Sequence, residues 1–299
     1  MRLYVYVPFL ACVASAMTAH ALARRNNPRI AAIVLICSGV ILAGASSAAL
    51  SLLAFPALAQ LPLVASLGHW SATAVPAHVP VPTWLAILAF CCVIAIVIDV
   101  GRVLMQYVDG LTQALRVQRA SRGAMIVVDD PAVYAYACRP WPWRRGVVII
   151  SDGLQRALDE DERAAVLAHE QSHLAHHHGV FQLFSQIIAA INPLLRPLQR
   201  EIAFCIERWA DEDAAVVSGR NVAAAALATS ADRGTHAPPS FGLAHSTSNV
   251  CERVQALLDE PPTRDGRFLT TVAINAVIAV GAVCLAAHST ELIFEALRR

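Results

Sequence analysis

Long apolar runs separated by short polar segments dominate the first third of the chain. Three runs cover residues 3–23, 30–54 and 83–107, and a fourth covers residues 268–287. A helix needs roughly 20 apolar residues to cross the hydrocarbon core of a bilayer. The pattern therefore predicts about four transmembrane helices, three before residue 108 and one in the segment 267–299.

The polar segments between these runs predict an orientation. The loop after the first run carries Arg24, Arg25 and Arg29, whereas residues 55–82 contain no Arg, Asp or Glu. The positive-inside rule places the arginine loop in the cytoplasm and the N-terminus outside. The first run also fits a cleaved signal peptide, but cleavage would leave the arginines outside, so we interpret this run as a transmembrane helix.

Composition agrees with a multi-pass protein of the plasma membrane, of bacterial type. The chain is 57% hydrophobic and only 15% charged, whereas soluble domains are nearer a quarter charged. The net charge of +1 gives no reason to expect nucleic acid as a partner. The lipid bilayer is the one partner that composition predicts directly.

Residues 108–266 have an ordinary polar composition and predict an inserted α+β domain in a mostly α protein. Residues 125–128 and 147–150 have the pattern of short buried strands. Asp159 and Glu162 form a capping-box pattern, and the helix that they start should run to Gly179. Further helices are expected at 180–191, 197–218, 222–231 and 249–258. The helix 180–191 is too short to span the membrane, and it belongs either to the core or to the membrane surface.

The helix that starts at Asp159 contains the sequence Ala-His-Glu-Gln-Ser-His at residues 168–173. His169 and His173 are four residues apart, so both imidazoles project from one face of the helix. Glu170 follows the first histidine and can reach a water molecule at the metal without binding the metal itself. This is the H-E-x-x-H arrangement of two zinc ligands and a general base.

A catalytic zinc ion also needs a third protein ligand, and the helix 197–218 offers Glu207 and Asp211. These carboxylates are again four residues apart, so one can bind zinc while the other orients a ligand imidazole. A metzincin site would instead need Gly at position 176 and His at position 179, where this chain has His176 and Gly179. His176 and His178 are left as polar residues of the helix end or as helpers near the site.

At this point the sequence resembles the gluzincin membrane peptidases, above all the BlaR/MecR-type antirepressor peptidases, which are related to HtpX-like and CAAX prenyl proteases. The resemblance is sharpest in residues 147–173 and 207–214 and weaker in residues 252–254. It implies Zn²⁺ held by His169, His173 and Glu207, with Glu170 as base and Asp211 as the orienting carboxylate. It also implies that the strand 147–150 pairs with an extended substrate, and that Arg253 matches a family arginine.

The antibiotic-sensing members of that family continue into a penicillin-binding sensor domain. This chain stops at Arg299 and has no S-x-x-K motif, so we do not expect it to sense β-lactams by itself.

Together these features predict zinc-dependent hydrolysis of a protein or peptide on the cytoplasmic side. The first hypothesis is regulated proteolysis of a transcriptional repressor, such as a winged-helix protein. The alternatives are HtpX-like quality control of membrane proteins and a non-catalytic metal-binding receptor, against which the intact Glu170 argues. A donor for the oxyanion is expected among His236, His245 and Arg253, between which the sequence does not choose.

Overall fold

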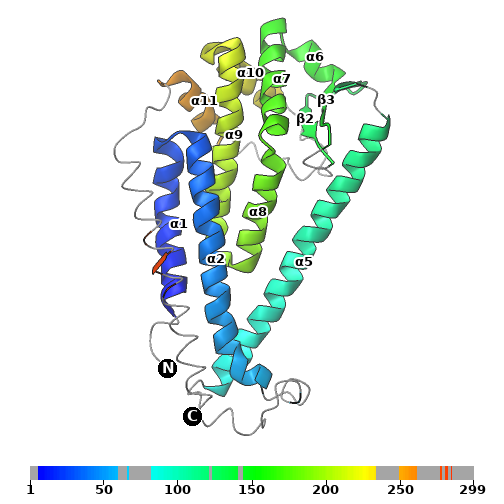
Figure 1. The fold of residues 1–299 in the computed structure, drawn as a ribbon. Coiled ribbons are helices and arrows are strands. Elements are labelled where there is room, and N and C mark those ends of the chain that lie inside the picture. Colours follow the sequence, from blue (N-terminus) through cyan, green and yellow to red (C-terminus); the bar gives the residue numbers. More distant parts are fainter. Residues whose placement is uncertain are drawn as a thin grey trace.

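A computed structural model of the chain describes residues 6–59, 66, 82–120, 123–140, 144–233, 249–260, 277, 280, 281 and 284. Within this part the protein is mostly helical, with one small three-stranded sheet. Four helices, α1, α2, α8 and α9, run side by side, while α5 slants away from them (Figure 1). The sheet and the helices α6, α7, α10 and α11 gather at one end of this bundle (Figure 1).

Three described helices are long and apolar enough to cross a membrane: α1 (Val7–Arg25), α2 (Pro28–Ala59) and α5 (Thr83–Ala120). They match the first three predicted transmembrane helices, so this part of the prediction is confirmed. The predicted fourth helix, 268–287, lies outside the described residues apart from isolated positions. The helix α5 continues past residue 107, where we divided the membrane region from the inserted domain, and its 38 residues extend about 57 Å.

Apolar side chains remain uncovered along α5. Trp84, Ile87, Val97 and Ile98 each expose about half or more of their surface. An apolar surface of this length is typical of a helix that faces lipid. The apolar helices therefore fit a membrane protein.

The helix α8 (His178–Ile191) and the helix α9 (Arg196–Ser218) form a hairpin that packs among these long helices. The sequence left the segment 180–191 either in the core or at the membrane surface, and in the structure it packs into the core. A short 3-10 helix, η2 (Pro193–Leu195), links the two helices. Before it, the Asn192 side chain donates hydrogen bonds to Ser46 Oγ at 3.0 Å and to Cys12 Sγ at 3.3 Å. The turn of the hairpin is thus fixed between α1 and α2, because a buried amide needs such partners.

The strand β3 (Val147–Ser151) is central and fully buried, pairing in parallel with β1 (Met125–Val128) and antiparallel with β2 (Ala135–Cys138). The two predicted strands exist, although β1 is half exposed rather than buried. The prediction that 147–150 pairs with a substrate is wrong, because both edges of β3 are already paired. The strand β2 was not predicted, since Ala-Tyr-Ala-Cys offers no run of β-branched residues.

The helix that carries the histidine motif is α7 (Glu160–Ala175), and it begins as predicted. Asp159 Oδ1 accepts from the Glu162 N–H at 2.8 Å, and Glu162 Oε2 accepts from the Asp159 N–H at 3.2 Å. The short helix α6 (Asp152–Ala157), which precedes this capping box, was not predicted.

The predicted end of the motif helix at Gly179 is wrong. The helix stops at Ala175, and His177 takes a left-handed conformation with φ of 55° before α8 begins. Glycine is the usual residue in this conformation, and because position 177 is a histidine, nothing in the sequence indicates a break here. The break redirects the chain so that α8 packs against α2 and α5.

The remaining helices follow the predictions closely. The helix α10 (Arg220–Arg233) and the helix α11 (Val250–Leu258) flank α9 at the end that carries the sheet. Pro197 lies in the first turn of α9, as expected. The predicted loop 234–242 lies outside the described residues.

The hairpin requires close approach at one glycine of α2. A Cβ atom at Gly39 would lie 2.9 Å from both Ile188 Cδ1 and Leu198 Cδ2, whereas a Cβ at Gly44 of the same helix would meet nothing within 4 Å. We predict that Gly39→Val destabilises the protein by about 1–3 kcal/mol, because overpacking displaces α8 and α9. The measurement is the thermal unfolding midpoint in detergent.

The matched control is Gly44→Val, which should leave the midpoint nearly unchanged. Equal midpoints for the two variants would contradict the close packing of the hairpin on α2.

Candidate metal centre

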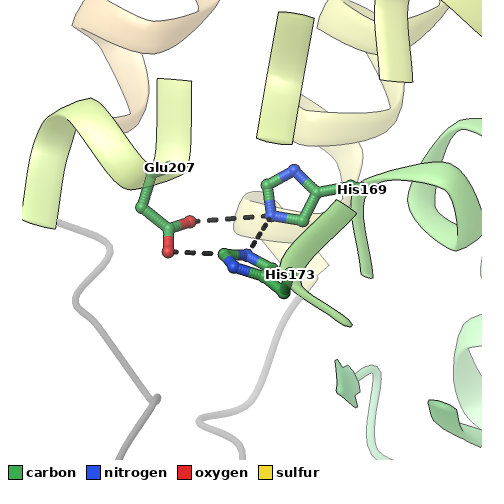
Figure 2. A group of neighbouring side chains, drawn as sticks. All are labelled: His169, His173 and Glu207. Atoms are coloured by element: carbon green, nitrogen blue, oxygen red, sulfur yellow. Dashed lines mark hydrogen bonds and ion pairs between the residues drawn. The ribbon is translucent and has the colours of Figure 1, made fainter. Parts of the chain in front are cut away.

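Three side chains from two helices converge at the contact between α7 and α9. His169 and His173 come from α7 and Glu207 comes from α9, and their ligand atoms all lie within 4.8 Å of one another. Figure 2 shows both imidazoles and the carboxylate pointing toward a common centre. The structure thus brings together the three residues that the sequence suggested as metal ligands.

The spacing of these atoms fits a small tetrahedral ion. The Nε2 atoms of His169 and His173 are 3.1 Å apart, and the Glu207 oxygens lie 3.6 and 3.7 Å from them. Zinc with ligands at about 2.0–2.2 Å places neighbouring ligand atoms about 3.3–3.6 Å apart in a tetrahedron. Two imidazoles and one carboxylate are also a donor set that zinc accepts in catalytic sites, with one position left open.

Each histidine has a partner that orients its ring. His169 Nδ1 lies 3.0 Å from Asp211 Oδ1, so a carboxylate holds the Nδ1 proton and leaves Nε2 free for a metal ion. His173 Nδ1 lies 2.9 Å from Nδ1 of the fully buried His178. Burial, followed by the charge on His173, lowers the pKa of His178 to about 2. A neutral His178 can therefore accept the Nδ1 proton of His173.

Arg253 of α11 holds both carboxylates of α9 from behind. Its Nε and Nη2 atoms each donate to Asp211 at 2.7 Å, and its Nη1 atom lies 3.1 Å from Glu207 Oε2. Burial alone would raise the pKa values of Glu207 and Asp211, but Arg253 and His169 outweigh it and lower both. This geometry favours a role for Arg253 in holding the carboxylates.

The charges of this cluster also suit a divalent cation. Glu170, Glu207 and Asp211 carry three negative charges when ionised, and Arg253 offsets one of them, which leaves two. Burial lowers the pKa of His169, but the hydrogen bonds that His169 donates to Asp211 and Glu207 outweigh it and raise the pKa to about 10. In the metal-free protein His169 thus retains a proton, which a metal ion has to displace.

Glu170 lies next to this group and against the sheet. Its carboxylate accepts a hydrogen bond from the backbone of Ala137 in β2. Burial and the charge of Glu207 raise its pKa to about 6, although His169 and Arg253 act in the opposite direction. A carboxylate with this pKa can take up and release protons near neutral pH.

The histidines that follow the motif have separate places. His176 Nε2 pairs with Asp213 Oδ2 at 3.0 Å, and the Ser172 hydroxyl donates to the same oxygen at 2.6 Å. These contacts join α7 to α9 beside the metal group, and His176 takes no part in it. His245 and His236 lie outside the described residues.

Several residues at the centre escaped the sequence analysis. The Trp209 ring packs against His176 and His178, with centroids 4.6 and 4.7 Å away. It follows Glu207 by two residues in sequence, but an aromatic residue on a helix is usually a core residue. Ser172 and Asp213 also gave no signal, because their contact depends on how α7 and α9 pack. The strand residue Ala137 was missed together with β2.

Comparison with known proteins gives one match. The model of Peptidase family M48, a family of zinc metallopeptidases, matches residues 102–200. This segment contains His169, Glu170 and His173 and ends before Glu207. The match indicates a metallopeptidase and gives no support for the BlaR/MecR-type assignment in particular. No curated protein and no solved structure matched the chain.

The contacts of Asp211 predict its effect on metal affinity. In Asp211→Ala, His169 loses the acceptor for its Nδ1 proton and Arg253 loses two hydrogen bonds. We expect zinc affinity to fall about 10- to 100-fold, measured by competition with a chromophoric chelator on purified protein that binds one zinc ion per chain.

Asp213→Ala is the matched control, because Asp213 is on the same helix and contacts Ser172 and His176 but none of the three metal-group residues. It should change zinc affinity by no more than a few fold. If both variants lose affinity equally, the orienting role of Asp211 is wrong.

Proposed function

We propose that this protein is an integral-membrane zinc metalloendopeptidase that hydrolyses peptide bonds at the cytoplasmic face of the membrane. The match to Peptidase family M48 is the premise. The observation that carries the proposal is the convergence of His169, His173 and Glu207, with Glu170 adjacent. A site for structural zinc is closed and usually rich in cysteine, whereas this group has three ligands and a base.

In this proposal His169, His173 and Glu207 hold the zinc ion and Asp211 orients His169. Bound zinc supplies Lewis acidity, which polarises a carbonyl group and makes water nucleophilic near neutral pH. Glu170 takes a proton from the attacking water and delivers it to the leaving amine nitrogen. The oxyanion donor is proposed among His245, His236 and Arg253, of which Arg253 is already engaged with carboxylates.

The strand β2 is the edge at which we propose that an extended substrate binds. Ser151 N–H donates to the Tyr134 carbonyl, so alternation along the antiparallel pair turns the backbone groups of Ala135 and Ala137 away from β3. Ala137 reaches Glu170 from that side. A peptide paired with this edge would run directly past the general base.

Contacts of α9 with the turn between α1 and α2 support a site at the membrane surface. Next to Glu207, Arg208 Nη1 donates to the Ala23 carbonyl at 3.1 Å. The guanidinium of Arg29 lies 5.2 Å from the Trp209 ring centroid. We propose that this arginine-bearing turn faces the cytoplasm, with the N-terminus outside. The metal centre would then lie at the cytoplasmic surface of the membrane, beside this turn.

The hairpin of α8 and α9 would then be re-entrant. The helix α8 has 14 residues and extends about 21 Å from the metal centre to Asn192. Its turn therefore lies deep between α1 and α2, where Cys12 and Ser46 supply the partners that lipid cannot. A substrate would have to reach the site along the membrane surface.

Glu170→Gln tests the proposed chemistry. The amide cannot accept the water proton, so we expect cleavage of an unstructured substrate such as β-casein to fall by about 10²- to 10⁴-fold. Zinc content should remain at one ion per chain, because Glu170 is not a ligand. His169→Ala should lose both zinc and cleavage. Undiminished proteolysis by Glu170→Gln would contradict the role of Glu170 as general base. A zinc-loaded wild type that cleaves nothing would favour a non-catalytic receptor.

Within this activity we retain regulated proteolysis of a winged-helix transcriptional repressor as the first hypothesis, with quality control of membrane proteins as the alternative. Arg24 of the α1–α2 turn donates to Glu252 Oε2 at 2.9 Å, and Glu252 precedes Arg253. This link supports regulation, because it joins the membrane helices to the residue that holds Glu207 and Asp211.

Co-expression with a repressor encoded in the neighbouring reading frame separates the two hypotheses. We expect a repressor fragment on immunoblots with the wild type and none with Glu170→Gln. An intact repressor beside cleaved misfolded membrane proteins would favour quality control instead.

A further inference from the structure

A cavity of about 180 Å³ opens beside the metal centre, between α5, β2 and the start of α8. His173 is among its lining residues, so the cavity adjoins the candidate site on the His173 side. From α8 it is lined by Gly179, Val180, Gln182, Leu183 and Gln186, and the spacing of all but Val180 places them on one helix face. The cavity has room for one long side chain.

Gln182 is the unusual residue of this lining. Its side chain is 3% exposed, and neither its amide nitrogen nor its amide oxygen has a hydrogen-bond partner among the described residues. Leaving such a group unpaired is costly. The buried Asn192, which follows the other end of α8, has partners for its amide. Both amide atoms are covered in this conformation, so a ligand that enters the cavity can supply what Gln182 lacks once this side chain rotates toward it.

The other polar groups around the cavity favour an uncharged ligand. Gln106 and Gln186 contribute two more neutral amides beside Tyr107 and His177, and no Asp or Glu is among the lining residues that the structure describes. The cation Arg139 is engaged with the Leu174 carbonyl at 2.7 Å. Lipid tails and aliphatic side chains would leave the Gln182 amide unpaired, and a charged side chain would lose its hydration. A carboxamide offers both a donor and an acceptor without charge.

We propose that this cavity is a specificity pocket that receives a glutamine side chain of the substrate, next to the cleaved bond, and that Gln182 recognises its carboxamide. This inference rests on the proposed peptidase function and adds the substrate preference. Sites built to hydrogen-bond a substrate group discriminate strongly against analogues that lack it, because their own polar groups then stay unpaired.

The test uses the full-length zinc-loaded protein in detergent. Cleavage sites in β-casein are mapped by mass spectrometry, and ten-residue peptides around the best site are synthesised. Each of the three positions on either side of the cleaved bond carries Gln, Met, Leu or Glu in turn. We expect one position at which Gln exceeds Met about 10- to 100-fold in kcat/KM.

In Gln182→Met, which conserves length and volume, that preference should be lost or reversed in favour of Met, while zinc content stays at one ion per chain. Gln255→Met is the matched control, because Gln255 is exposed on α11 and bonds only to Asp259. It should keep the preference for Gln.

The possible failures are distinct. A wild type that cleaves casein but shows no preference for Gln at any position overturns the specificity pocket and leaves the peptidase function standing. The same holds if Gln182→Met keeps the preference unchanged. A zinc-loaded wild type that cleaves nothing overturns the peptidase function, and the pocket with it. If Gln182→Met fails to bind zinc, the wild-type peptide profile alone decides the question.

Discussion

The contact between α7 and α9 buries carboxylates that each need a cationic partner, and the helices around this contact supply those partners. Glu207 and Asp211 face His169, His173 and Arg253 in an interior where an unpaired ion costs several kcal/mol. Three helices must therefore assemble together, since α11 brings the arginine. Asp211 pairs with Arg253 through two bonds of 2.7 Å, so this pair fixes α11 against α9. With Glu170 ionised and His169 neutral, Glu170, Glu207 and Asp211 leave two negative charges beyond Arg253, which a divalent ion offsets.

The helix α9 ties this charged centre to the membrane bundle. Its first half packs apolar side chains such as Leu198 and Ile202 against α1 and α2, and its second half carries the two carboxylates. The helix α9 is stiff and starts just after Asn192. The position of Asn192 between α1 and α2 therefore determines where Glu207 lies along the axis of the bundle. Arg208 then caps the carbonyl end of α1 through the Ala23 carbonyl, which favours the helix end electrostatically. The chemistry is thus positioned by the same packing that holds the long helices together.

The predictions from the sequence were wrong at two places: the end of the histidine-motif helix and the pairing of the strand β3. His177 takes a left-handed conformation without being glycine, so the predicted helix ran past its real end. The strand β2 lacks the β-branched residues that mark strands, and without it β3 looked like an edge. Both errors concern the side on which we propose that the substrate binds, because α8 and β2 line the cavity next to His173. The side with the candidate metal ligands, in contrast, depends on spacings within single helices, and the structure brings these residues together.

By itself the sequence determined the features that repeat along one element: the long apolar runs, the capping box of Asp159 and Glu162, and the four-residue spacings of His169 with His173 and of Glu207 with Asp211. These follow from helix periodicity and need no knowledge of neighbours. Only the tertiary structure decided that His178 faces His173, that Arg253 holds both carboxylates, and that Gln182 borders the cavity. Such contacts join different elements, and the side-chain periodicity of one helix does not predict which other helix packs against it. The physical reason is that packing between elements depends on the whole buried surface, whereas the spacing of ligands depends on the local helix alone.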